Sequence, residues 1–551
     1  MNRAKITCLF LAVLAIAAAP AARAQTANLA ARLPANTIFY VYFRGTASIP
    51  AGSKNALGSL WNDPGFAPAR QIIEQSVVDS LEHNPRLAGV PRGDLESLLA
   101  HPMIFGIRLT QGTPANAKPQ SNGQGFLVVE TEGKTGKELR AALAAKPSGA
   151  SRVRLTSTGF LVYSENPATL ADLARRFGAH APAESSSLAA VPAFAQARAE
   201  LRGHPTLDIF LRVPEMPLLH PQVRPGFNTA AFLKALHLER IQVLCGSMDL
   251  SEPGSLAHFA ILGDPAPGGP FDLFGANAAE FSTLAAAPAG ASYDVARLDL
   301  AAGFTLIEHA LSVSLDPQQA ARLNLLTGIF SASVLPALGG EYATVWPHPG
   351  SDEGPVLAIT IHEKAAHQLF QSALASFLQP AGQEGDILFF RAEPPSSAPA
   401  SAKTGGKPEP DAKSPTPAGR GPSFIALTPH LLLAGHDEQA VRRMALAVTS
   451  AHPPAGLAAE ARFQAARATL PAELSGFGYF DLTQIDWTRW LERTAAEWAK
   501  NDKNPQAARH AQAIETWARE GGGAVLARHL HLLLLGAWKD STGVHWRGDL
   551  H

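Results

Sequence analysis

The stretch VRLTSTGFLVYSENPATLADL, from Val153 to Leu173, encodes two strands and the start of a helix. Its β-rich runs Val153–Leu155 and Phe160–Tyr163 flank Ser-Thr-Gly, which is the pattern of a tight hairpin. Asn166 then precedes a proline, and a capping side chain before a first-turn proline favours a helix start at that point. The stretch therefore predicts an antiparallel hairpin that leads into a helix.

The same succession of residues recurs later in the chain. GFLVYSENPATLADL from Gly159 corresponds to HLLLAGHDEQAVRRM from His430. Four more pairs match in the same order: LPANTIFYVYF with APAGASYDVAR, GFLVVETEGK with PVLAITIHEK, SLAAVPAFAQARAEL with GLAAEARFQAARATL, and VLCGSMDL with LLLGAWKD. Collinear matches favour an internal duplication over the chance reuse of patterns that α+β proteins share. We expect two tandem copies, in residues 25–270 and 271–551.

Each copy is expected to be an α+β domain, a mainly antiparallel sheet with helices packed on one face, because its strands fall in adjacent hairpins. A doubly wound parallel sheet would need strict alternation of strands and helices, which the sequence lacks. The second copy carries two insertions. Ala392–Pro422 is rich in Pro, Ser, Ala and Lys and is expected to be a disordered linker. Residues 485–521 are expected to form a helical insertion.

Brief proteolysis of the intact protein should cut first within Ala392–Pro422. The composition of this segment cannot bury enough apolar surface to fold, so its backbone should fit a protease site more readily than the rest of the chain. Mass spectrometry of the first fragments locates the cuts. First cuts elsewhere, with this segment protected, would contradict the prediction.

The N-terminus has the form of a signal peptide, in residues 1–24. A basic start is followed by an apolar run from Ile6 to Ala19 and by the small-x-small sequence Ala22-Arg23-Ala24. The run is shorter than the roughly 20 apolar residues that span a bilayer. We therefore expect a secreted, periplasmic or extracellular protein with no transmembrane helix after cleavage. Cys245 is then the only cysteine of the mature chain, so an intramolecular disulfide is excluded.

Charge and composition exclude one class of partner. The formal net charge of the 551 residues is -1, and the sequence has no basic cluster of the kind that nucleic-acid-binding proteins carry. No nucleic-acid partner is expected.

Two segments together resemble a family of exported bacterial proteins that contain domain of unknown function 3352. They are LPANTIFYVYFRG, from Leu33, and SSSLAAVPAFAQARAELRGHPTLDIFLRV, from Ser185. The resemblance spans most of the chain as a pattern, without an invariant functional motif. It implies an envelope or extracellular location and supplies no catalytic residue.

Motifs for enzyme chemistry are missing from the sequence. His362, Glu363 and His367 come closest to a zinc-protease helix, but the second histidine stands at i+5, where i+4 is required. His529 and His531 are expected to alternate on an exposed strand face and offer too few ligands for a metal. Nucleophile-elbow, Walker A and dinucleotide-binding patterns do not occur. We therefore assign no catalytic residue, no metal and no cofactor.

Two groups of residues are weak candidates for contact with a ligand or partner. One is a polar, turn-rich loop that includes Trp346, His348 and Asp352, although ordinary hairpin chemistry explains such a loop equally well. The other is the face of the helical insertion, where aromatic residues are more often packed core than a surface for sugars or a partner. Its residues are Trp487, Trp490 and Trp498.

These observations favour a non-catalytic binding or scaffolding protein of the cell envelope, with an unknown envelope ligand or protein as its partner. The alternative is a hydrolase with a site between the two copies, because a Ser-His-Asp triad needs no fixed spacing in the sequence.

Residues that match between the copies are mostly apolar or glycine. Val41 matches Val295, and Phe194 matches Phe463, each phenylalanine lying in an Ala-rich helix and expected to be buried. Arg198 and Arg467 follow the phenylalanines and are expected to lie at the surface, where an ion pair contributes about 0–1 kcal/mol. The copies therefore share a scaffold and no evident site.

Overall fold

The computed structural model describes residues 29–82, 92–109, 123–131, 137, 141, 152–179, 186–200, 205–218, 227–250, 255–329, 331, 334–348, 353–392, 423–450, 454–501 and 505–551. The chain divides into two compact units. Unit 1 comprises Met1–Asp272, His309–Pro317 and Leu482–His551, and unit 2 comprises Leu273–Glu308 and Gln318–Asp481. The expected signal peptide and all of the expected linker except Ala392 lie outside the described residues.

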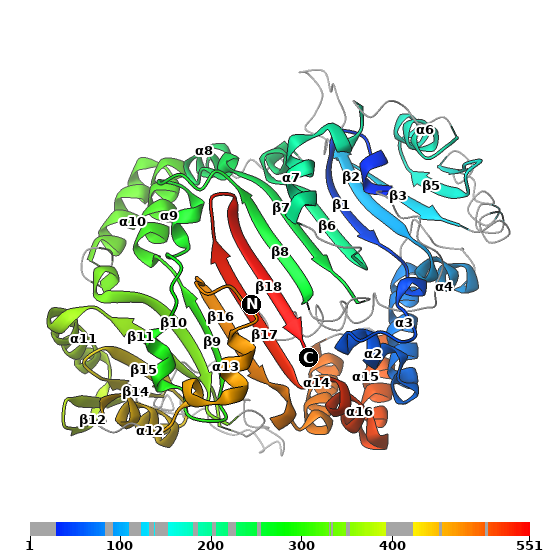
Figure 1. Cartoon of the computed structure of the whole chain (residues 1–551). Coiled ribbons are helices and arrows are strands. Elements are labelled where there is room, and N and C mark those ends of the chain that lie inside the picture. The colour runs from blue at the N-terminus through cyan, green and yellow to red at the C-terminus, as the bar shows by residue number, and fades with distance from the viewer. Residues whose placement is uncertain are drawn as a thin grey trace, which may run out of the picture. The chain divides into compact units, whose positions relative to one another are not determined.

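The strands of unit 1 form one antiparallel sheet. They are β1 (Thr37–Phe43), β2 (Met103–Leu109), β3 (Gly123–Glu130), β4 (Val153–Leu155), β5 (Phe160–Ser164), β6 (Leu207–Arg212), β7 (Ile241–Met248), β8 (Ser255–Gly263), β17 (Leu532–Lys539) and β18 (Gly543–Leu550). Their spatial order is β4-β5-β3-β2-β1-β6-β7-β8-β18-β17, and every described pair is antiparallel (Figure 1). The C-terminal hairpin belongs to unit 1 because β18 pairs along its length with β8.

Helices of unit 1 cover both faces of this sheet. They are α2 (Ala56–Asn62), α3 (Ala67–Glu82), α4 (Arg92–Ala100), α6 (Pro167–Arg176), α7 (Pro192–Glu200), α8 (Thr229–Ala235), α14 (Trp487–Asn501), α15 (Pro505–Trp517) and α16 (Gly523–His529). Val128 of β3 lies in a core cluster with Phe194 of α7. Its neighbour Val129 faces the opposite way, into a cluster with Val78 of α3 and Leu99 of α4.

The expectation of helices on one face is therefore wrong for unit 1. Successive side chains of a strand point to opposite faces, so a strand that is buried on both sides reads as a continuous apolar run. Residues 126–129 of β3, Phe-Leu-Val-Val, are such a run. The antiparallel α+β architecture itself is confirmed.

The strands of unit 2 are also paired antiparallel. Its strands are β9 (Ser292–Arg297), β10 (Leu338–Trp346), β11 (Val356–Ile361), β12 (Gln379–Glu384), β13 (Ile387–Arg391), β14 (Phe424–Leu427), β15 (Leu431–Gly435) and β16 (Gly476–Asp481). The order is β16-β9-β10-β11-β15-β14-β13-β12, again antiparallel throughout the described pairs.

Both faces of the unit 2 sheet are covered as well. The helices are α10 (Pro317–Ile329), α11 (Glu363–Phe377), α12 (Glu438–Thr449) and α13 (Ala461–Arg467), while α9 (Leu300–Ser314) begins in unit 2 and ends in a segment of unit 1. Phe390 of β13 packs in a cluster with Phe370 of α11. Phe389, on the other face, lies 4.2 Å from the guanidinium carbon of Arg442 in α12.

Local sequence signals predicted the correct elements in several places. The hairpin β4–β5 forms with Gly159 at φ +86°, a conformation that glycine adopts without strain. Asn166 caps α6 by accepting a hydrogen bond from the Thr169 backbone N–H at 3.0 Å. Helices are present within residues 485–521, as α14 and α15, and both belong to unit 1. No described helix combines the length and apolar character that crossing a membrane requires.

One local prediction was wrong. His529 is the last residue of α16, and His531 precedes β17, so the two histidines do not alternate on a strand. The residues around His529, GAVLARH, contain good helix formers, and their apolar members Val525 and Leu526 are buried on one side of the helix. The apolar run that suggested a strand begins only after this helix ends.

Candidate functional site

A pocket of about 460 Å³ lies in unit 1 beside α6, and most of the residues that line it have polar side chains. It is lined by Pro34, Ala35, Asn36, Arg108, Gln124, Asn166, Ala168, Thr169, Asp172, Arg176 and Ser186. We call it the arginine pocket. The β4–β5 hairpin positions this pocket, because it leads directly into α6.

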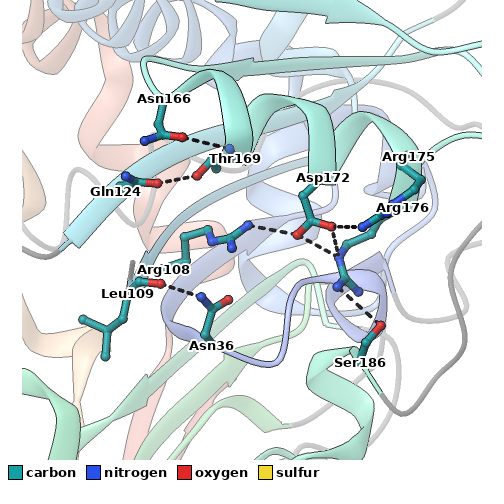
Figure 2. A network of polar contacts seen from close by, with 10 residues as sticks. All are labelled: Asn36, Arg108, Leu109, Gln124, Asn166, Thr169, Asp172, Arg175, Arg176 and Ser186. Carbon is teal, nitrogen blue, oxygen red and sulfur yellow. Dashed lines mark hydrogen bonds and ion pairs between the residues drawn. The ribbon is translucent and has the colours of Figure 1, made fainter. Parts of the chain in front are cut away.

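Asp172 is the centre of the polar network in this pocket (Figure 2). Arg108 of β2 reaches it from one side, with Nη1 2.9 Å from Oδ2. Arg175 and Arg176 reach it from its own helix, at 2.7 Å and 3.2 Å from Oδ1. Arg176 also donates to the Ser186 hydroxyl at 3.4 Å. Three guanidinium groups therefore share one carboxylate.

The ionised form of Asp172 is stabilised by these neighbours. Burial alone would raise the pKa of Asp172, but the hydrogen bonds from Arg175 and Arg176 and the nearby charges of Arg176 and Arg108 hold that pKa below its ordinary value. Among the four described side chains of this network, one negative charge faces three positive charges at neutral pH.

Two guanidinium nitrogens in the network have no acceptor among the described residues. Arg176 is only 6% exposed, and its Nη1 is buried without a hydrogen bond. Arg108 Nε is in the same condition. An unsatisfied buried donor costs about 1–3 kcal/mol, more when charged, so an acceptor supplied by a ligand would relieve that cost.

The remaining polar groups fix the shape of the pocket. Asn36 donates to the Leu109 carbonyl, and Thr169 donates to the side-chain oxygen of Gln124 (Figure 2). The N-terminal end of α6 also borders the pocket and contributes a partial positive charge. The arrangement suits an anionic group that accepts several hydrogen bonds.

A larger cavity of about 1110 Å³ lies within unit 2, but its buried carboxylate, Glu341, already has partners. Glu341 pairs with Arg297 at 3.3 Å and accepts a hydrogen bond from the Thr283 backbone N–H at 3.0 Å. Glu384 binds Arg442 at 2.8 Å. His362 borders the cavity as the N-terminal cap residue of α11. We therefore place the candidate site in the arginine pocket, where buried donors lack acceptors.

A Ser-His-Asp contact exists in unit 1 and has a structural explanation. His529 Nδ1 lies 3.2 Å from Ser59 Oγ, and Nε2 lies 2.8 Å from Asp63 Oδ2. Asp63 also caps the short helix Pro64–Phe66 and pairs with Arg528 at 3.2 Å. The hydrogen bond from His529 is the main reason that the pKa of Asp63 is lowered. None of the three residues lines the arginine pocket or the unit 2 cavity, so we read the contact as a tie between α2 and α16.

The loop candidates are not brought together as a site among the described residues. Trp346 packs against Phe480, with ring centroids 5.4 Å apart. His348 has a side chain that is 58% exposed and stands 3.9 Å from Glu353 Oε2. Asp352 lies outside the described residues.

The tryptophan candidates pack against other side chains of unit 1. Trp487 is buried and makes an edge-to-face contact with Trp490, at 5.5 Å between ring centroids. Both line a small apolar void of about 50 Å³. Trp498 lies against His510, with centroids 6.2 Å apart. This environment is that of a packed core, as helical spacing of aromatic residues usually indicates.

The arginine pocket was not among the sequence candidates. Asp172 and Arg176 stand at i and i+4 on α6, which is a visible pairing, but such pairs are common on solvated helices. Arg108 is distant in the chain, and only the pairing of β1, β2 and β3 brings it to the helix.

Comparison with known proteins gives no relative to set beside this geometry. No protein-family model, no curated protein and no solved structure matches this chain.

Proposed function

We propose that this protein is an exported, non-catalytic binding protein of the cell envelope, and that the arginine pocket holds an anionic group of its ligand. The buried, acceptor-less Nη1 of Arg176 is the observation that carries this proposal. The signal-peptide pattern of residues 1–24 supports export to the periplasm or the exterior. A carboxylate or a phosphate matches the donor set, because guanidinium groups bind both with paired hydrogen bonds.

Binding is favoured over hydrolysis by the chemistry of the pocket. Among the described residues, its lining contains one carboxylate, held ionised by arginines, and no histidine or cysteine. A general base needs a pKa near the operating pH and a position beside the reacting group. Asp172 satisfies neither condition, since its pKa is lowered and its oxygens are engaged by arginines.

We also propose that the two α+β regions arose by duplication. The strand pairings support this: β1 contacts β2 and β6 in unit 1, and β9 contacts β10 and β16 in unit 2. The β3–β5 pair corresponds to β11–β15 in the same way. The isolated bridges Pro34–Ser187 and Pro288–Gly456 occupy matching places in the two sequences.

The duplication proposal changes the match of Val41 with Val295 that the sequence suggests. The pairing of β1 with β2 skips Ile38, which marks a β-bulge with one extra residue. Tyr40 lies opposite Phe210, and Tyr293 lies opposite Tyr479. The strands therefore align Tyr42, in place of Val41, with Val295.

The ligand proposal is tested with succinate and inorganic phosphate as probes. Either anion should bind the mature protein saturably, and Arg176→Gln should weaken binding at least about tenfold, the equivalent of one charged hydrogen bond. Isothermal titration at low ionic strength measures the affinity, and native mass spectrometry of protein from its own periplasm identifies a retained ligand.

Arg175→Gln is the matched control, because Arg175 also binds Asp172 but has a side chain that is 64% exposed and does not line the pocket. The affinity of Arg175→Gln for either anion should stay within about threefold of the wild-type value, because an exposed ion pair contributes little. If Arg176→Gln unfolds, Arg108→Gln replaces it. Equal affinity in the wild type and in these pocket variants, or no binding of either anion, would overturn the proposal.

A further inference from the structure

Two histidines of unit 1 meet on one face of its sheet, where β8 and β18 pair. His545 lies opposite Ala260, and His258 lies two residues before Ala260 on the same strand. Paired residues, and residues two apart on a strand, point to the same face. The imidazole centroids are 6.1 Å apart, and Trp538 lies nearly parallel to both rings.

Glu200, the last residue of α7, is the third member of this group. Its Oε2 lies 3.3 Å from His545 Nδ1. Its backbone carbonyl accepts a hydrogen bond from His258 Nδ1 at 3.1 Å. One ligand atom from each of Glu200, His258 and His545 lies within 4.8 Å of the other two.

The partners of the two histidines orient their lone pairs. Asp540 Oδ1 lies 3.1 Å from His545 Nε2, and a carboxylate can only accept, so this nitrogen carries a hydrogen. In the neutral ring the lone pair is then on Nδ1, which faces Glu200. For His258, donation to the Glu200 carbonyl leaves the lone pair on Nε2. Histidines that bind a metal typically donate their other ring N–H to a carboxylate or a backbone carbonyl in this way.

The contact between His545 and Glu200 needs a positive charge. His545 is 1% exposed, and its Nδ1 makes no hydrogen bond of good geometry with any described residue, although the Glu200 carboxylate is 3.3 Å away. A lone pair that faces a carboxylate in a buried place is repelled, unless a proton or a cation lies between them.

We propose that Glu200, His258 and His545 bind a divalent transition-metal ion of the zinc type. Two imidazoles and one carboxylate form a common three-ligand set for zinc, with a fourth position open to water. Ligands at zinc distances stand roughly 3.3 Å apart, so binding would draw the group inward. The Glu200 side chain, 25% exposed at the end of its helix, has the freedom to do so.

This site departs from the expectation of no metal that the sequence supports. Its ligands come from a helix and two strands that are far apart in the chain, so no spacing motif exists. The inference rests on this cluster alone and does not depend on the arginine pocket.

Zinc titration of the mature, untagged protein after dialysis against EDTA tests the site. We expect one saturable site per chain by isothermal titration, and visible absorption bands of tetrahedral geometry when Co²⁺ replaces zinc. Glu200→Gln and His258→Gln should each weaken zinc binding more than about tenfold. Asp540→Asn should weaken it about 10–100-fold, because Asp540 orients His545.

His348→Gln is the matched control, since it removes another histidine near a glutamate, at a place that is 58% exposed. Its affinity should equal that of the wild type. Circular dichroism of the metal-free variants checks that each is folded. If one of the two ligand variants does not fold, the other one tests the site. Absence of saturable binding by the wild type, or unchanged affinity in both Glu200→Gln and His258→Gln, would overturn the proposal.

Discussion

Replacing Phe194 with alanine should lower the free energy of unfolding by about 3–5 kcal/mol, and replacing Phe463 should have an effect of similar size. Phe194 is 2% exposed and contacts Phe210 edge-to-face at 5.6 Å between centroids. Phe463 is 5% exposed and contacts Tyr479 at 5.2 Å. Both helices are rich in alanine, so each phenylalanine supplies much of the apolar area that its helix buries.

Urea denaturation followed by circular dichroism measures both changes. The transition that shifts in Phe194→Ala is assigned to unit 1, and the one that shifts in Phe463→Ala is assigned to unit 2. Phe194→Leu and Phe463→Leu serve as controls and should cost less, because they leave a smaller cavity. A loss under 1 kcal/mol in either alanine variant would show that its helix is not anchored through this side chain.

Replacing Arg198 with alanine should cost about 2–3 kcal/mol at pH 7, because it leaves a buried carboxylate without its charged partner. Arg198 Nη1 lies 2.6 Å from Asp208 Oδ2, and Asp208 is 1% exposed. The expectation that Arg198 forms a surface ion pair is therefore wrong, because its partner carboxylate is buried. The partner Asp208 lies on β6, and its burial is a property of the folded sheet.

The loss of stability caused by Arg198→Ala should become smaller as the pH is lowered from 7 to 5. Burial raises the pKa of Asp208 to about 6, against the opposing effect of Arg198. A group whose pKa is raised by folding contributes stability at low pH and loses it as the pH rises through the folded pKa. Without Arg198 the pKa of Asp208 rises further, so at pH 5 Asp208 is neutral in the variant. The variant should then lose little of its free energy of unfolding. Denaturation at both pH values measures the difference.

Arg467→Ala is the control for this prediction. Arg467 donates to the carbonyls of Pro471 and Ala472 at 2.6 Å and lies 5.7 Å from the centroid of the Phe477 ring. Under the proposed alignment, Phe477 corresponds to Asp208, so a cation–π contact stands where unit 1 has an ion pair. Its loss should cost about 0.5–1 kcal/mol at either pH. An equal cost for both arginines, or no pH dependence for Arg198→Ala, would contradict this account.

Local structure was predictable wherever the chain's own neighbours decide it. The hairpin around Gly159, the cap at Asn166 and the helix Pro192–Glu200 follow from turn residues, capping side chains and apolar spacing. The core positions of Phe194 and Phe463 also follow, because helical spacing identifies a buried face without reference to its partner.

The tertiary structure alone decided which face of each element meets which partner. Val129 is buried against α3 because the unit 1 sheet is covered on both sides, and Arg198 is partly buried because β6 places Asp208 beneath it. The arginine pocket joins β2 to α6, and the Glu200, His258 and His545 cluster joins α7 to β8 and β18. Spacing along the chain carries no information about such contacts, because strand pairing between distant segments sets which side chains meet.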